Sequence, residues 1–176
     1  MALAFAGTAA GIVIWPAYLA GVPDNTGMGV VCGPDGRGYR DVPAYGGLPP
    51  HPIIVQAVPP ARLPSDAAPA WQWHDIRDTG VLQLAACVRL LSDTPSGEFC
   101  SYTRGLPQVA EQQEVRTARY EITVFELRTH RVIDRQEMVG DHDACPEYKL
   151  ADKAVYTGLS DAQLHAALDR HVDRPG

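Results

Sequence analysis

The residues Asp141, His142 and Asp143 carry side chains that divalent metal ions prefer. Carboxylate oxygens and an imidazole nitrogen could bind such an ion if His74 or Asp75 came to the same place in the fold. Their spacing along the chain does not require that they meet. We therefore interpret residues 141–143 as a polar loop, keep the three residues as weak candidate metal ligands, and expect no cofactor.

Nucleophilic catalysis would need a serine or cysteine held beside a histidine and an acid. The sequence contains no Gly-x-Ser-x-Gly, and Cys87 falls in the middle of an expected strand. Asp161, His165 and Asp169 share one helix face at four-residue spacing, which a solvated face explains. No glycine-rich phosphate loop opens a helix. The residue types therefore favour a protein that is not an enzyme.

Four cysteines are disulfide candidates: Cys32, Cys87, Cys100 and Cys145. None belongs to a C-x-x-C pair of the kind that structural zinc sites use. An even number of cysteines behind a membrane or secretion segment favours disulfides over buried thiols, and four cysteines allow three pairings. A Cys87–Cys100 bond would flank an expected hairpin, and a bond from Cys145 to Cys87 across the sheet is the alternative. Either pairing predicts an extracytoplasmic domain.

Trp71 and Trp73 are two residues apart and share a face if the segment is extended. Such a pair could form an exposed contact for a protein partner or a glycan. It could equally cover the edge of a small core.

The first 22 residues contain no charged side chain, and the first ionised residue is Asp24. About 20 mostly apolar residues suffice to span a membrane, so residues 1–22 are expected to form an uncleaved membrane anchor in contact with lipid. A cleaved signal peptide and a buried soluble helix are the alternatives. Gly7 and Gly11 form a G-x-x-x-G that would let the anchor pack against another helix.

Proline and glycine are concentrated in the first 70 residues, which argues against long regular elements there. We therefore divide the chain into an anchor or signal at 1–22, a Pro/Gly-rich extended segment at 23–70, and a compact domain at 71–176. The net charge of −6 leaves no electrostatic basis for binding nucleic acid.

Apolar residues alternate with polar ones over 81–91 and 116–128, and 53–58 is a short β-branched run. The pattern predicts strands there, a turn at 93–97, a return strand at 98–104, and a hairpin completed by 131–139. The apolar phase changes by one residue between Val124 and Phe125, which fits a β-bulge. Ser160 and Gln163 form a capping box before a C-terminal helix. The expected fold is α+β: an antiparallel sheet with a C-terminal helix, behind a single transmembrane helix.

Several stretches, taken in order, resemble a family of uncharacterised extracytoplasmic domains of actinobacteria that follow one membrane segment. They are Ala44–Gly47 leading into His51–Val55, Leu82–Val88, Cys100–Tyr102, Ala118–Leu127 and Ala144–Pro146. The chain has Thr129-His130 where that family has a Thr-Gly turn, and it lacks the family's basic cytoplasmic flank. The resemblance implies location and fold, and it implies no catalytic residue.

Together these patterns favour a non-enzymatic, membrane-anchored extracytoplasmic domain in a single-pass protein. We expect it to bind protein partners, as an accessory subunit of a membrane complex. A metal-dependent extracytoplasmic enzyme using residues 141–143 and a secreted ligand- or glycan-binding module are the alternatives.

Overall fold

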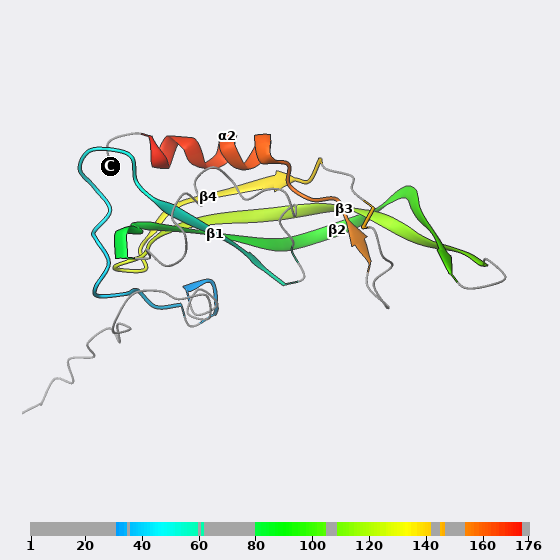
Figure 1. Cartoon of the computed structure of the whole chain (residues 1–176), viewed down its shortest axis with the longest axis horizontal. Helices are drawn as coiled ribbons and strands as arrows, with labels where there is room; N and C mark the ends of the chain where they lie inside the picture. The colour runs from blue at the N-terminus through cyan, green and yellow to red at the C-terminus, as the bar shows by residue number, and fades with distance from the viewer. Residues whose placement is uncertain are drawn as a thin grey trace, which may run out of the picture.

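The computed structural model describes residues 31–34, 36–59, 61, 80–104, 109–141, 145–146 and 154–173. They form a β-sheet with the strand order β1-β2-β3-β4 and the helix α2, which covers one face (Figure 1). The element bounds are β1 Ile53–Val58, β2 Leu84–Arg104, β3 Val109–Glu126, β4 Val132–Val139, β5 Val155–Tyr156 and α2 Asp161–Val172. The predicted α+β class, mostly sheet with one C-terminal helix, is confirmed.

The sheet was predicted to be antiparallel, but it combines both strand directions. β1 runs parallel to β2, with Ile53 opposite Leu84 and Val58 opposite Arg89. β2, β3 and β4 follow one another in antiparallel order, and the short β5 pairs in parallel with residues 115–116 of β3. β1 therefore joins a three-stranded antiparallel meander from the side, at one end of the much longer β2.

The expected hairpin between 81–91 and 98–104 is wrong, because residues 84–104 form one continuous strand. The predicted turn is instead a register shift between Pro95 and Phe99 in the pairing with β3. Gly97 takes a φ of +84° there, a conformation that suits glycine. The Ser96 hydroxyl donates to the Val115 carbonyl oxygen at 2.7 Å and so ties the bulge to β3. β3 is long enough to pair on both sides of the bulge, so the chain does not have to reverse.

The irregularity predicted at Val124 and Phe125 is confirmed as a register shift in the β3–β4 pairing. The extra residue is Ile133 on β4, however, and β3 pairs with β2 without interruption from Tyr120 to Glu126. The apolar residues of β3 move from one face of the sheet to the other here, because both faces are covered at this end of the sheet. Val124 lies in the cluster under α2, whereas Leu127 lies in a second cluster on the opposite face.

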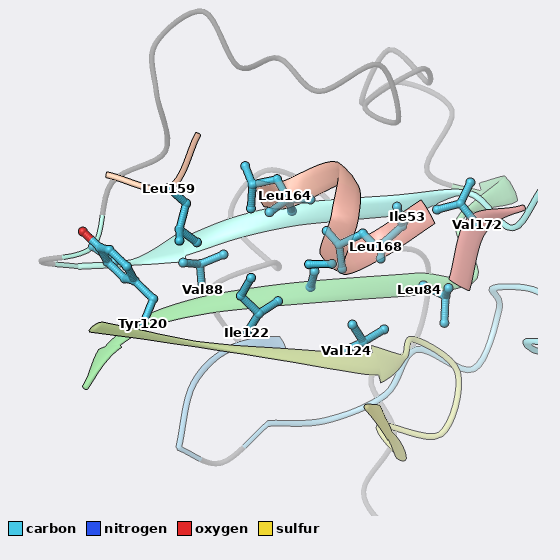
Figure 2. Close-up of a cluster of buried hydrophobic side chains, with 14 of the residues drawn as sticks. Ile53, Leu84, Val88, Tyr120, Ile122, Val124, Leu159, Leu164, Leu168 and Val172 are labelled. Atoms are coloured by element: carbon cyan, nitrogen blue, oxygen red, sulfur yellow. The ribbon is translucent and has the colours of Figure 1, made fainter. Parts of the chain in front are cut away.

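The main core lies between α2 and the sheet, as Figure 2 shows, with the helix side chains directed onto those of the strands. Its largest fully buried members include Ile53, Leu84, Tyr120, Ile122, Leu164 and Leu168. The helix residues that meet the sheet follow helical spacing and are all buried: Leu164, Ala167, Leu168 and Val172. Burying such side chains contributes about 1.5–3 kcal/mol each.

The start of α2 follows its predicted capping box. The backbone N–H of Gln163 donates to Ser160 Oγ at 3.4 Å, and the Ser160 N–H donates to Gln163 Oε1 at 3.2 Å. The side-chain Nε2 of Gln163 also donates to the Val139 carbonyl oxygen at 2.8 Å. One residue thus caps the helix and fixes its N-terminus to the end of β4.

On the opposite face, residues 31–34 and 36–42 pack against the sheet. Val31, Tyr39 and Val42 are buried with Leu82, Ala85 and Leu127. The Tyr39 N–H donates to the Leu127 carbonyl oxygen at 2.8 Å. Gly38 is required at this point, because a Cβ on it would lie 2.2 Å from the Arg128 carbonyl oxygen.

Within the described part of the chain, no helix combines the length and the apolar character needed to cross a membrane. The expected anchor at 1–22, with Gly7 and Gly11, lies outside the described residues, as do Trp71 and Trp73.

Candidate functional site

Two disulfides attach segments outside the sheet to β2. Cys32 is bonded to Cys87 and Cys100 to Cys145, with Cα–Cα distances of 5.5 and 5.6 Å. Both pairings considered from the sequence, Cys87–Cys100 and Cys145–Cys87, are wrong. Cys87 and Cys100 lie far apart along one strand instead of facing each other across a hairpin. Two disulfides indicate that the protein folds in an oxidising, extracytoplasmic environment.

The carboxylate of Glu126 is buried at the end of β3, where it holds residues from separate segments through hydrogen bonds. It accepts hydrogen bonds from the Tyr45 backbone N–H at 3.1 Å, the Thr129 hydroxyl at 2.6 Å and the Arg131 guanidinium at 3.4 Å. Burial raises the pKa of Glu126, but the hydrogen bonds from Thr129, Tyr45 and Arg131 outweigh burial and lower it below its usual value. An ionised carboxylate thus fixes residue 45 to the sheet.

His51 fixes the other end of the loop that starts at Tyr45. Its side chain is fully buried, and its Nδ1 lies 2.8 Å from Gln83 Oε1. Its backbone N–H donates to the Val172 carbonyl oxygen at the end of α2, at 2.8 Å. The Tyr45 ring meets the imidazole edge to face at 4.9 Å between centroids. Among the described residues, His51 Nε2 finds no hydrogen-bond partner.

The loop between these two fixed points, residues 46–50, presents the most exposed large apolar side chain of the described chain. Leu48 is 87% exposed, whereas the flanking Tyr45 and His51 are partly or fully buried. In Figure 1 this loop lies at the same end of the molecule as the C-terminus of α2. An apolar side chain is therefore held in solvent by a loop that is fastened on both sides.

Asp134 on β4 connects the sheet to the last turn of α2. Its carboxylate pairs with the Arg170 guanidinium and lies 3.1 Å from His171 Nε2. Burial raises the pKa of Asp134, but hydrogen bonds from His171 and Arg170, with the charge of Arg170, lower it overall. An acid beside an imidazole can orient a general base, yet here an arginine neutralises the acid. The arrangement clamps α2 onto β4.

His130 joins residues 31–34 to the turn between β3 and β4. Its Nε2 lies 2.8 Å from the Val31 carbonyl oxygen, and its ring stacks on Phe125 with 4.4 Å between centroids. Its φ of +58° is the left-handed conformation that the turn requires. The neighbouring disulfide from Cys32 to Cys87 holds the same segment covalently.

Most of the candidate metal ligands lie outside the described residues. Asp141 is exposed, whereas His142, Asp143, His74 and Asp75 lie outside the described residues. Among the residues described, no group of three or more His, Cys, Asp or Glu side chains could hold an ion. His165 lies 3.0 Å from Asp169 on the exposed face of α2, as the helical spacing predicts.

Sequence reasoning missed Glu126, His51 and Leu48. Glu126 follows the polar phase of its strand, and nothing local distinguishes it from an exposed glutamate. His51 lies between prolines in a segment expected to be extended, which gives no sign that α2 covers it. These roles depend on long-range contacts: Tyr45 is 81 residues from Glu126 in the chain.

No protein-family model matches this chain, and the comparisons with curated proteins and with solved structures gave no match.

Proposed function

We propose that this chain is a non-enzymatic, membrane-anchored extracytoplasmic domain that binds a protein partner as an accessory subunit of a membrane complex. The observation that carries the proposal is Leu48, an apolar side chain held in solvent at 87% exposure by a fastened loop. The charge-free segment 1–22 supports the anchor, and the two disulfides agree with its extracytoplasmic side.

The loop has the properties of a preformed binding element. Glu126 holds Tyr45 at its start, and Val172 and Gln83 hold His51 at its end. A loop that is already ordered loses less conformational entropy on binding, so its apolar contact contributes more to affinity. Loops placed by a rigid scaffold often carry binding residues.

The buried Glu126 and the partly buried Asp134 support a binding role over a catalytic one. Glu126 accepts three hydrogen bonds that hold the loop and the β3–β4 turn. Asp134 is neutralised by Arg170 while it holds α2. Each of these side chains is engaged in positioning the segments around it.

The test is mild-detergent extraction of the full chain from its native membrane, followed by native-size separation and mass spectrometry. We expect the wild-type chain to migrate in an assembly larger than itself with its N-terminus intact. Leu48→Ser should release it from that assembly, because the substitution removes an exposed contact without touching the core.

Val139→Ser is the matched control, since Val139 is an exposed apolar residue at 46% on β4, away from the loop. It should leave the assembly intact. A wild-type chain that migrates alone, or equal release by both variants, would overturn the proposal.

A further inference from the structure

The far end of the β2–β3 hairpin forms an arm, defined here as residues 98–104 of β2 and 109–114 of β3. β1 pairs with β2 only up to Arg89, and β4 pairs with β3 only from Arg119 onward. Within the described residues the arm is therefore two-stranded. Figure 1 shows it reaching well beyond the other strands, at the opposite end from the Leu48 loop.

The arm is fastened at its base. Cys100 is buried and bonded to Cys145, and it packs with Val115 and Val155 of β5. Two-stranded ribbons alone are only marginally stable in water, so these contacts and the bulge at Gly97 give the arm a fixed direction. An ordered strand edge is thereby held away from the body of the molecule.

The outer edge of the arm, residues 98–104, lacks two of the devices that prevent strand pairing. It contains no proline and no lysine, and Phe99 is 56% exposed on it. The β4 edge carries charges along its middle, at Asp134, Arg135 and Glu137, whereas the two charges of the arm edge stand at its ends. β1 is uncharged, but none of its side chains is exposed.

The sequence of this edge is self-complementary in charge. It reads Glu-Phe-Cys-Ser-Tyr-Thr-Arg, with the acid at register position 98 and the base at position 104. Suppose that this edge pairs antiparallel with the same edge of a second copy, with the two Ser101 residues opposite each other. Position 98 of each copy then falls opposite position 104 of the other, which gives two pairs of opposite charge. Phe99 then falls opposite Thr103, a favourable aromatic and β-branched pair.

We propose that two copies of this chain associate through antiparallel pairing of residues 98–104, with the twofold axis at Ser101. The pairing would join the two ribbons into a continuous four-stranded sheet and cover both Phe99 rings. It uses a surface separate from the Leu48 loop, and it stands or falls independently of the proposed membrane complex.

The first test is cysteine cross-linking of the purified full chain. In Ser101→Cys the two introduced thiols lie on adjacent strands across the axis, within reach of a disulfide. Gln112→Cys is the matched control, because Gln112 is exposed and opposite Ser101 on the same arm. Its copies would be three strand spacings apart, roughly 14 Å, too far for a bond.

We expect mild oxidation to give a reducible dimer of Ser101→Cys and no dimer of Gln112→Cys on denaturing gels. Equal dimer yields for the two variants, or no dimer for either, would overturn the proposal.

The second test swaps the charges in the Ser101→Cys background. Glu98→Arg or Arg104→Glu alone turns two attractive pairs into two repulsive ones and should lower dimer yield about tenfold. The double variant restores opposite charges and should restore the yield. A single variant with unchanged yield, as expected if residues 1–22 alone drive association, would contradict pairing through the arm.

Discussion

At the scale of single residues, buried and partly buried polar side chains attach the Leu48 loop and α2 to the sheet. Glu126 and His51 fix the two ends of the Leu48 loop, and Asp134 fixes the last turn of α2. A buried acceptor that satisfies several donors is costly to remove, because each donor then loses its partner without regaining water. The stability of the loop therefore depends on a few polar atoms.

Glu126→Ala should lower the free energy of unfolding by about 2 kcal/mol, because the Tyr45 N–H and the Thr129 hydroxyl lose their acceptor. Urea unfolding monitored by circular dichroism measures this. Glu137→Ala removes an acid whose ion pair with Arg119 is half exposed, and it should cost less than about 0.5 kcal/mol. An equal loss of unfolding free energy in the two variants would show that the hydrogen bonds to Glu126 do not stabilise the fold.

Stability should fall as the pH drops into the acid range. The folded-state pKa values of Glu126 and Asp134 lie below their ordinary values of about 4.3 and 3.9. The ionised forms therefore stabilise the fold above those ordinary values, and this contribution is lost as the pH falls through the lower folded pKa values. Urea midpoints between pH 7 and pH 3 measure the loss. The double variant Glu126→Gln/Asp134→Asn should show a flatter pH dependence, and an unchanged slope would contradict the assignment.

At the scale of elements, α2 is the best specified by local sequence. Ser160 supplies the N-cap and Gln163 closes the box while bonding to β4. The apolar spacing of Leu164, Ala167, Leu168 and Val172 then determines the face that meets the sheet. All of these signals lie within 13 residues, so they could be predicted without the rest of the fold.

Ser160→Ala should lower the free energy of unfolding by about 1 kcal/mol, because it removes the acceptor for the Gln163 N–H. Ser160→Asp keeps an acceptor at the cap and should retain most of the stability. Thermal unfolding compares the two variants. An equal loss of stability in Ser160→Ala and Ser160→Asp would mean that the side-chain cap contributes little.

The strands show where sequence reasoning fails. Residues 53–58 and the α+β class could be predicted from β-branched runs and alternation. The turn residues at 93–97 could not be distinguished from a bulge, since that depends on whether β3 extends far enough to pair with both halves of β2. The change of apolar face near Phe125 could be seen, but its cause is a second covering layer that includes Val31, Tyr39 and Val42. Partners this distant leave no local pattern.

At the scale of the whole molecule, the disulfides hold two covering segments onto the sheet. Cys32–Cys87 joins residues 55 apart, and Cys100–Cys145 joins residues 45 apart. Loops of this size give about 4 kcal/mol of stabilisation per bond in the chain-entropy model. Each disulfide should therefore keep its own segment from opening away from the sheet.

Cys32→Ser/Cys87→Ser should lower the free energy of unfolding by about 4 kcal/mol and speed hydrogen exchange at the Tyr39 amide, which bonds to Leu127. The Thr157 amide, which bonds to Arg116, should stay protected. Cys100→Ser/Cys145→Ser should reverse this pattern. Exchange that speeds equally at both amides in either variant would show that the two segments do not behave separately.

The order of the cysteines along the chain also bears on how the protein is made. The first bonds to the second and the third to the fourth, so neither loop encloses or interlaces with the other. A chain that emerges from its N-terminus into an oxidising compartment exposes Cys32 and Cys87 before Cys100 and Cys145. Oxidation in order of emergence then produces the native bonds directly. By this route the domain would need an oxidant but no reshuffling of disulfides.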